Sequence, residues 1–180
     1  MEHSQGMNPR VCFSFCLATC FVFLAAARGA HAQAAENTLV AGVGLVQYDL
    51  NGVGNAAGVT IRGTRALTNH LAVEGSVPMA WPMESFGRSR LFAPEAHLQY
   101  HWLAGPFRPY AGGGAGFAWR DKGALVPSEV NLTLSVAGGT RFDVNDRFAL
   151  LGELRLRGIE RDFAASTAEW IGGVSWRIGQ

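Results

Sequence analysis

Charged residues are scarce in this sequence, and lysine is nearly missing. Only 16% of the 180 residues are charged, Lys122 is the one lysine, and the formal net charge is +1. A nucleic-acid-binding protein that acts through a broad basic surface needs a marked positive excess, so that class is excluded. The apolar content of 48% is too high for a disordered chain. The length fits one compact domain.

Cysteine is confined to the start of the chain, where all three copies lie in the apolar run at residues 11–27. Arg10 precedes this run, and the small-residue pattern Ala30-His31-Ala32 follows it, as in a secretory signal peptide. A run of this length is at the low limit for a transmembrane helix. We therefore expect residues 1–32 to be a signal peptide and residues 33–180 to be the mature domain. That domain could form neither a disulfide nor a thiolate metal site.

Helical periodicity is nearly absent, and apolar and polar residues instead alternate with a period of two, which indicates β-strands. In residues 92–102, for example, the polar positions are Glu95, His97, Gln99 and His101. Eight strands are expected near residues 38–49, 57–67, 70–79, 90–103, 108–120, 129–143, 147–159 and 167–178. Every second connection between them is short, as in outer-membrane barrels. The pattern predicts an all-β fold, an eight-stranded antiparallel up-and-down transmembrane β-barrel.

The polar face of these strands carries charges of both signs, which suits the interior of a small membrane barrel. Gly112, Gly114 and Gly116 alternate on the same face and would leave room for long side chains. Six arginines against three glutamates predict an excess of positive charge, with water, carbonyls or loop carboxylates such as Asp121 supplying the remaining partners. The predicted polar network in the lumen consists of Arg62, Glu74, Glu95, His97, His101, Arg120, Arg141, Glu153, Arg155, Arg157 and Arg177.

Large aromatic residues gather near the strand ends on the apolar face. Two groups at opposite rims are expected, as in the aromatic girdles that sit at both interfaces of membrane barrels. If the first strand starts in the periplasm, one rim holds Tyr100, Trp102, Phe142, Phe148 and Trp176. The other rim then holds Phe92, Phe117, Trp119 and Trp170.

Residues 107–117 read Phe-Arg-Pro-Tyr-Ala-Gly-Gly-Gly-Ala-Gly-Phe and resemble the Arg-Pro-Tyr turn and glycine-alternating fifth strand of the small outer-membrane barrels. Residues 136–142 are similar to the strand that follows in that family, which includes the OmpA transmembrane domain and OmpX. The resemblance covers nearly the whole mature chain. It implies residence in the Gram-negative outer membrane, contact with its lipid, insertion by the barrel-assembly machinery and a packed polar lumen. It implies no single shared activity and no cofactor.

A cluster of Glu95, His97 and His101 on one strand, with Ser135 two strands away, raises the possibility of a hydrolase site or a metal site. Buried hydrogen-bond networks often imitate such sites. Since these side chains are expected to point into the lumen, we expect a structural network and predict neither a catalytic nor a metal-binding residue.

The expected function is that of an integral protein of the outer membrane, exported through the periplasm, with a structural or generic surface role. Two alternatives remain open at this stage. A soluble periplasmic carrier of the lipocalin type has a similar length and strand number, and release into the soluble periplasmic fraction would favour it. A narrow pore that favours anions would follow from an arginine excess in the lumen, although eight strands leave little open space.

Overall fold

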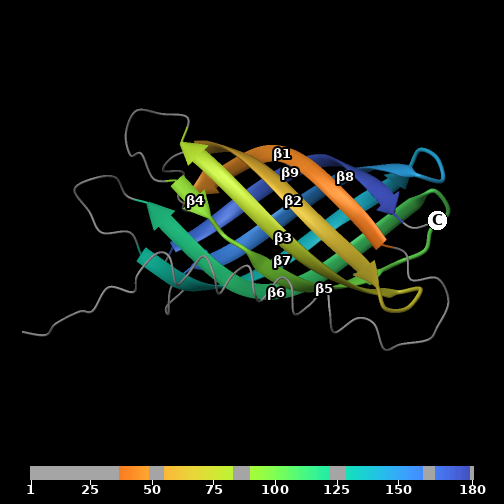
Figure 1. Cartoon of the computed structure of the whole chain (residues 1–180), viewed down its shortest axis with the longest axis horizontal. Coiled ribbons are helices and arrows are strands. Elements are labelled where there is room, and N and C mark those ends of the chain that lie inside the picture. Colours follow the sequence, from red (N-terminus) through yellow and green to blue (C-terminus); the bar gives the residue numbers. More distant parts are fainter. Residues whose placement is uncertain (1–36, 49–54, 83–89, 122–128, 160–164, 179–180) are drawn as a thin grey trace, which may run out of the picture. The chain divides into compact units, whose positions relative to one another are not determined.

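The computed structural model describes residues 37–48, 55–82, 90–121, 129–159 and 165–178. The predicted signal peptide lies outside these residues. The described chain is almost entirely β-strand (Figure 1). Consecutive strands pair antiparallel, except that β4 and β5 do not pair with each other and both pair with β3 and β6. The strands are β1 (Asn37–Tyr48), β2 (Asn55–Ala66), β3 (Leu71–Pro82), β4 (Arg90–Phe92), β5 (Glu95–His101), β6 (Phe107–Asp121), β7 (Glu129–Asp143), β8 (Phe148–Ile159) and β9 (Ala165–Ile178).

The sheet closes on itself because β1 pairs with both β2 and β9. The pairing can be followed once around the barrel from Thr38 in β1, through Glu74 in β3 and Arg157 in β8, and it returns to β1 at Tyr48, ten positions further along. This stagger tilts the strands against the barrel axis by about 40°, as Figure 1 shows. A closed sheet has no edge, so no row of backbone donors is left without partners in hydrocarbon.

Three short turns, at residues 67–70, 102–106 and 144–147, lie at one end of the barrel, called the turn end below. Gly105 has a φ of 64° in the second turn, a conformation that glycine adopts without strain. In the third turn, the Asn145 side chain accepts hydrogen bonds from the backbone of Arg147 and Phe148. These local bonds explain why the third turn needs so few residues.

The fourth barrel strand was predicted as continuous over residues 90–103, but the structure divides it into β4 and β5. Pro94 lies between them, and Pro78 on β3 lies beside the same gap. Ala93 donates to the Pro78 carbonyl and Phe117 to the Pro94 carbonyl, whereas the reciprocal bonds are missing since proline has no N–H group. Pairing resumes in the same register on both sides. The break is therefore a loss of two hydrogen bonds and not a bulge, and the barrel has eight strands as predicted.

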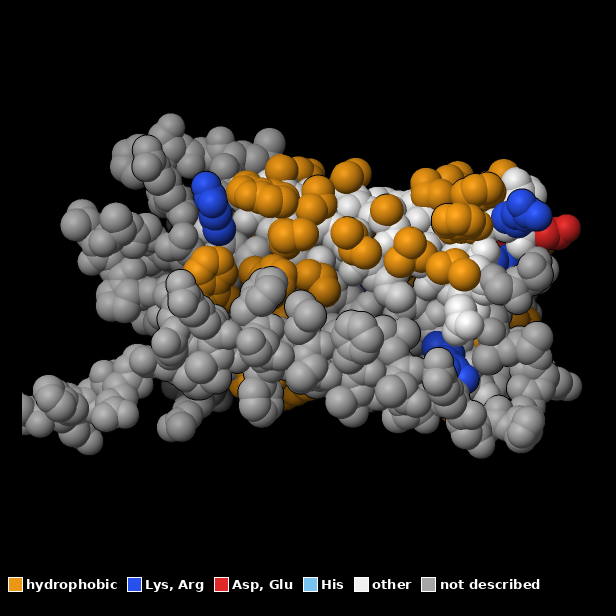
Figure 2. All heavy atoms as spheres, in the orientation of Figure 1, with side chains coloured by type: hydrophobic (Ala, Val, Ile, Leu, Met, Phe, Trp, Pro, Cys, Tyr) orange, Lys and Arg blue, Asp and Glu red, His pale blue; other side chains and the backbone are white. Residues whose placement is uncertain are grey.

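Apolar side chains cover the outside of the barrel and charged side chains fill the inside. Val43 and Val136 are 66% and 60% exposed, whereas Arg155 and Arg157 are 0% and 1% exposed. Hydrophobic side chains spread along the visible wall of the barrel in Figure 2, with basic ones near its two ends. Among the described residues, no helix is long and apolar enough to cross a membrane. With apolar side chains outside and charged side chains inside, the outer wall is suited to hydrocarbon and not to water.

Glycines on the inner face lie where no side chain would fit. A Cβ atom added at Gly116 would lie 2.1 Å from the Pro94 carbonyl oxygen. We expect Gly116→Ala to destabilise the folded barrel by about 1–3 kcal/mol, because the backbone would have to shift. At Gly152, which faces outward, an added Cβ meets nothing within 4 Å, so Gly152→Ala is the matched control. Urea unfolding in lipid vesicles measures both, and equal stabilities of the two variants would contradict this expectation.

Candidate functional site: the polar network in the barrel interior

Glu95 on β5 is the centre of the polar network. Its Oε1 atom lies 2.6 Å from Nε of Arg157, and its Oε2 atom lies 3.4 Å from Nη1 of Arg155. Thr133 and Ser135 on β7 each donate a hydrogen bond of 2.9 Å to the same carboxylate. Two guanidinium groups and two hydroxyls therefore surround one buried carboxylate, which offsets the cost of removing it from water.

Arg155 on β8 connects opposite walls of the barrel. Its Nη2 atom lies 2.8 Å from Glu74 Oε1 on β3, and its Nε atom lies 3.1 Å from Glu153 Oε1 on its own strand. Its Nη1 atom also donates to Ser76 Oγ at 3.0 Å. With the bond to Glu95, this side chain contacts three carboxylates.

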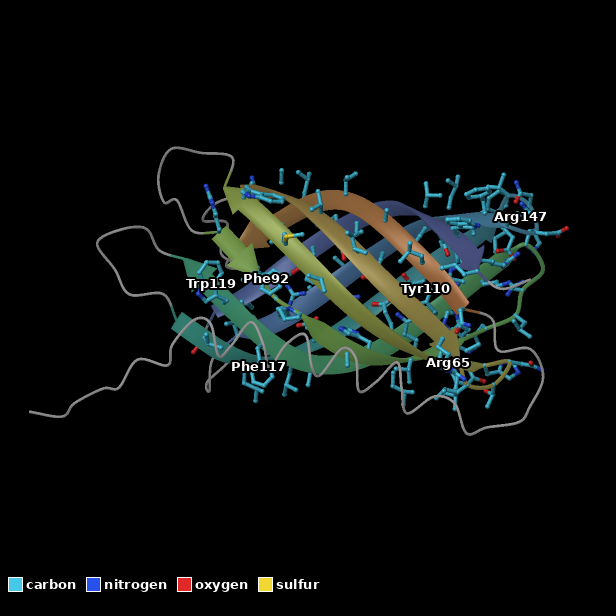
Figure 3. The ribbon with its side chains drawn as sticks, viewed as in Figure 1. Arg65, Phe92, Tyr110, Phe117, Trp119 and Arg147 are labelled. Carbon is cyan, nitrogen blue, oxygen red and sulfur yellow. The ribbon has the colours of Figure 1, made fainter. Side chains whose placement is uncertain are left out.

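A second guanidinium lies nearer the turn end. Arg62 on β2 binds Glu153 Oε2 at 2.6 Å, and its Nη1 atom is 3.8 Å from Glu74 Oε2. Tyr110 on β6 donates its hydroxyl to Glu153 at 2.7 Å, and Gln99 donates to Glu74 at 2.9 Å. Figure 3 shows Tyr110 toward the turn end. The two glutamates thus link the inner layers of the network.

The expected excess of positive charge is wrong for the described lumen, because Glu169 on β9 also points inward. It binds Arg157 and accepts a hydrogen bond from Thr167. The buried arginines in the described lumen are Arg62, Arg141, Arg155 and Arg157, and the buried glutamates are Glu74, Glu95, Glu153 and Glu169. The side chains of Arg120 and Asp121 lie outside the described part of the chain. The buried charges therefore balance.

Ser135, His97 and Glu95 lie within hydrogen-bond distance of one another, but they are not connected as a catalytic triad. The His97 Nε2 atom is 3.0 Å from both Ser135 Oγ and Glu95 Oε2. In a triad, the serine and the acid bind opposite nitrogens of the ring, whereas Nδ1 of His97 has no hydrogen-bond partner among the described residues. No group of three metal-binding side chains occurs in the described part of the chain. The cluster fits a structural network.

The remaining predicted lumen residues lie toward the turn end. His101 is partly buried, lies 3.2 Å from Gln99 Oε1 and stacks on Tyr110 with ring centroids 5.3 Å apart. Arg177 is half-buried and binds Asp143 at 2.5 Å, and Asp143 also binds Arg108 at 2.8 Å. These ion pairs are nearer to solvent than the network around Glu95.

The predicted aromatic residues lie on the outer wall near the two ends. At the turn end, Tyr100 and Trp102 make an edge contact at 5.1 Å, and Phe148 stacks on Trp176 at 6.3 Å. Phe142 at this end packs against Phe107 at 4.8 Å. The opposite group consists of Phe92, Phe117, Trp119 and Trp170, of which Figure 3 labels the first three. Phe92 is partly buried, and the other eight predicted aromatic side chains are between 37% and 58% exposed.

An apolar layer closes the interior at the end opposite the turns. It consists of Val46, Ala56, Ala80, Leu91, Ala93, Ala118 and Ile159, all of them buried. Beside it, a cavity of about 10 Å³ is lined by residues that include Gly44, Gly58 and Glu169. A space of this size holds roughly one water molecule. The described residues therefore leave no room for a larger solute at this place.

Comparison with known proteins assigns the chain to a family. Residues 16–177 match the family model described as outer membrane protein beta-barrel domain. A comparison with curated protein sequences finds no match.

Three solved structures illustrate the shared fold. Neisserial surface protein A aligns at 14% identity over 81% of this chain and 100% of its own, with a TM-score of 0.70. Ail of Yersinia pestis, the attachment invasion locus protein, aligns at 15% identity over 81% and 100%, with a TM-score of 0.59. The outer membrane enzyme PagL aligns at 11% identity over 76% and 97%, with a TM-score of 0.52. At these identities the likeness is one of fold alone, and one of the three proteins is named as an enzyme. The chain therefore belongs to the outer-membrane protein β-barrel domain family and is an integral protein of the Gram-negative outer membrane.

Proposed function

We propose that this protein is a sealed structural component of the outer membrane with a generic surface role and no solute pathway. The observation that carries the proposal is the ion-pair network, in which Arg155 and Arg157 join β8 to β3 and β5 across the lumen and to the neighbouring β9. A permeating ion would have to separate these buried pairs, and breaking one buried pair costs about 3–5 kcal/mol. Outer-membrane lipid surrounds the barrel, and the barrel-assembly machinery inserts it.

Planar lipid bilayers test the sealed interior. We expect purified, refolded protein to give no conductance above the leak of the bare bilayer in potassium chloride solution. Folding is checked separately by heat-dependent migration in detergent gels, so that a lack of conductance cannot result from unfolded protein. Regular channel openings from inserted wild-type protein would contradict the proposal and favour the anion pore, whose selectivity a reversal potential would then measure.

A further inference from the structure

The outer wall of β8 and β9 carries an ordered strip of side chains that the interior network does not explain. Its first member is Arg147 at the turn end (Figure 3), an exposed residue whose side chain has no partner in the described part of the chain. Next come the paired residues Phe148 and Trp176, 43% and 49% exposed, with their rings stacked at an angle of 17°. Arg147 thus lies next to the Phe148–Trp176 ring pair, on its turn-end side, at the expected membrane interface.

Further along the same two strands, the outer wall has a gap. Leu150 and Val174 form the next outward pair, and Gly152 then faces Gly172. A Cβ added at either glycine meets nothing within 4 Å, and Trp170 beyond them is 58% exposed. At about 3.4 Å per residue, the gap lies about 14 Å along the strand from Phe148. Because the strands are tilted by about 40°, this corresponds to a depth of about 10 Å, within one leaflet of a hydrocarbon core about 30 Å thick.

We infer that this strip, from Arg147 to the Gly152–Gly172 gap, binds one phospholipid of the leaflet at the turn end. The guanidinium of Arg147 would hold the phosphate, since its planar fork of N–H donors matches phosphate oxygens. An acyl chain would lie over the Phe148–Trp176 pair and fill the gap. Short turns face the periplasm in barrels of this kind, so the lipid belongs to the periplasmic leaflet.

A second copy of the chain fits the strip less well. Two barrels in one membrane share the same orientation, so a symmetric contact through β8 and β9 would place the two Arg147 side chains at the same depth and close together. Like charges in contact repel, whereas a lipid phosphate complements the cation. Asp146, the exposed neighbour of Arg147 in the turn, would repel a lipid phosphate. Removing its negative charge therefore provides a second test of phosphate binding.

Native mass spectrometry of the folded protein in detergent, titrated with dioleoylphosphatidylglycerol, tests the inference. Arg147→Gln should weaken binding of the first lipid about fivefold, since one basic side chain is removed from a membrane surface site. Asp146→Asn should strengthen it. Gly152→Leu combined with Gly172→Leu fills the gap without changing charge and should also weaken it. All four positions face outward or lie in a turn, and heat-dependent gel migration verifies that each variant folds.

Two matched variants control for nonspecific effects. Arg90→Gln removes an exposed arginine at the other end of the barrel, and Gly113→Leu fills an outward glycine position on β6. Both should bind the first lipid as the wild type does. Wild-type affinity in Arg147→Gln, or equal losses in Arg147→Gln and Arg90→Gln, would overturn the site. Dimers that the glycine substitutions abolish, with lipid binding unchanged, would instead identify a second copy as the occupant.

Discussion

Replacing Arg155 with methionine should lower the free energy of unfolding by about 3–5 kcal/mol, the range observed when one partner of a buried ion pair is removed. Methionine keeps much of the volume but leaves Glu74, Glu95 and Glu153 without the guanidinium that contacts all three. Urea titration in lipid vesicles, followed by the difference in gel migration between folded and unfolded protein, measures the change.

The matched control for this variant is Arg90→Gln, in which an exposed arginine is removed from β4. Its stability should stay near that of the wild type, because surface charges contribute little. Combining Arg155→Met with Glu74→Gln should recover part of the loss, since one uncompensated carboxylate is then neutral. A single variant as stable as the wild type would show that Arg155 does not hold the network together.

Arginine placed at the middle of the outer wall should also destabilise the barrel strongly. Val136 is the central residue of β7 (Glu129–Asp143) and is 60% exposed. In a bilayer, Val136→Arg should cost about 2–4 kcal/mol, the range for arginine at the midplane of a membrane barrel. Urea unfolding in vesicles of phospholipids measures this cost.

Val144, 55% exposed in the turn that follows β7, provides the depth control. Val144→Arg should cost only about 0–1 kcal/mol, because arginine near an interface reaches water. Equal costs at the two positions would contradict the placement of Val136 within hydrocarbon. The comparison separates the effect of depth from the effect of the substitution itself.

Much of the fold could be predicted from the sequence because strand periodicity is local. Alternation places Glu153, Arg155 and Arg157 on one face and Leu154 and Leu156 on the other without any knowledge of neighbouring strands. Family membership, confirmed by the match over residues 16–177, adds closure of the sheet. The interruption of the fourth strand at Pro94 was not predicted, because it depends on Pro78 lying beside it on the neighbouring strand.

The partners within the network could not be predicted, because they depend on register and stagger. Arg157 meets Glu95 across the lumen although 62 residues separate them. Glu169 was missed although it has the same parity as Arg177, which was expected inside, so that signal was available in the sequence. Tyr110 was part of the recognised Arg-Pro-Tyr motif, but its hydrogen bond to Glu153 requires the folded barrel.

The proline-lined interruption between β4 and β5 also determines where the wall is weakest. Two ladder bonds are lost around one short segment, and β4 has only three residues. Less free energy is therefore needed to detach this tip than to unfold the whole sheet. Thermal fluctuations should therefore open the sheet first at β4. Amide protons of β4 should exchange with deuterium sooner than those at the centre of β7.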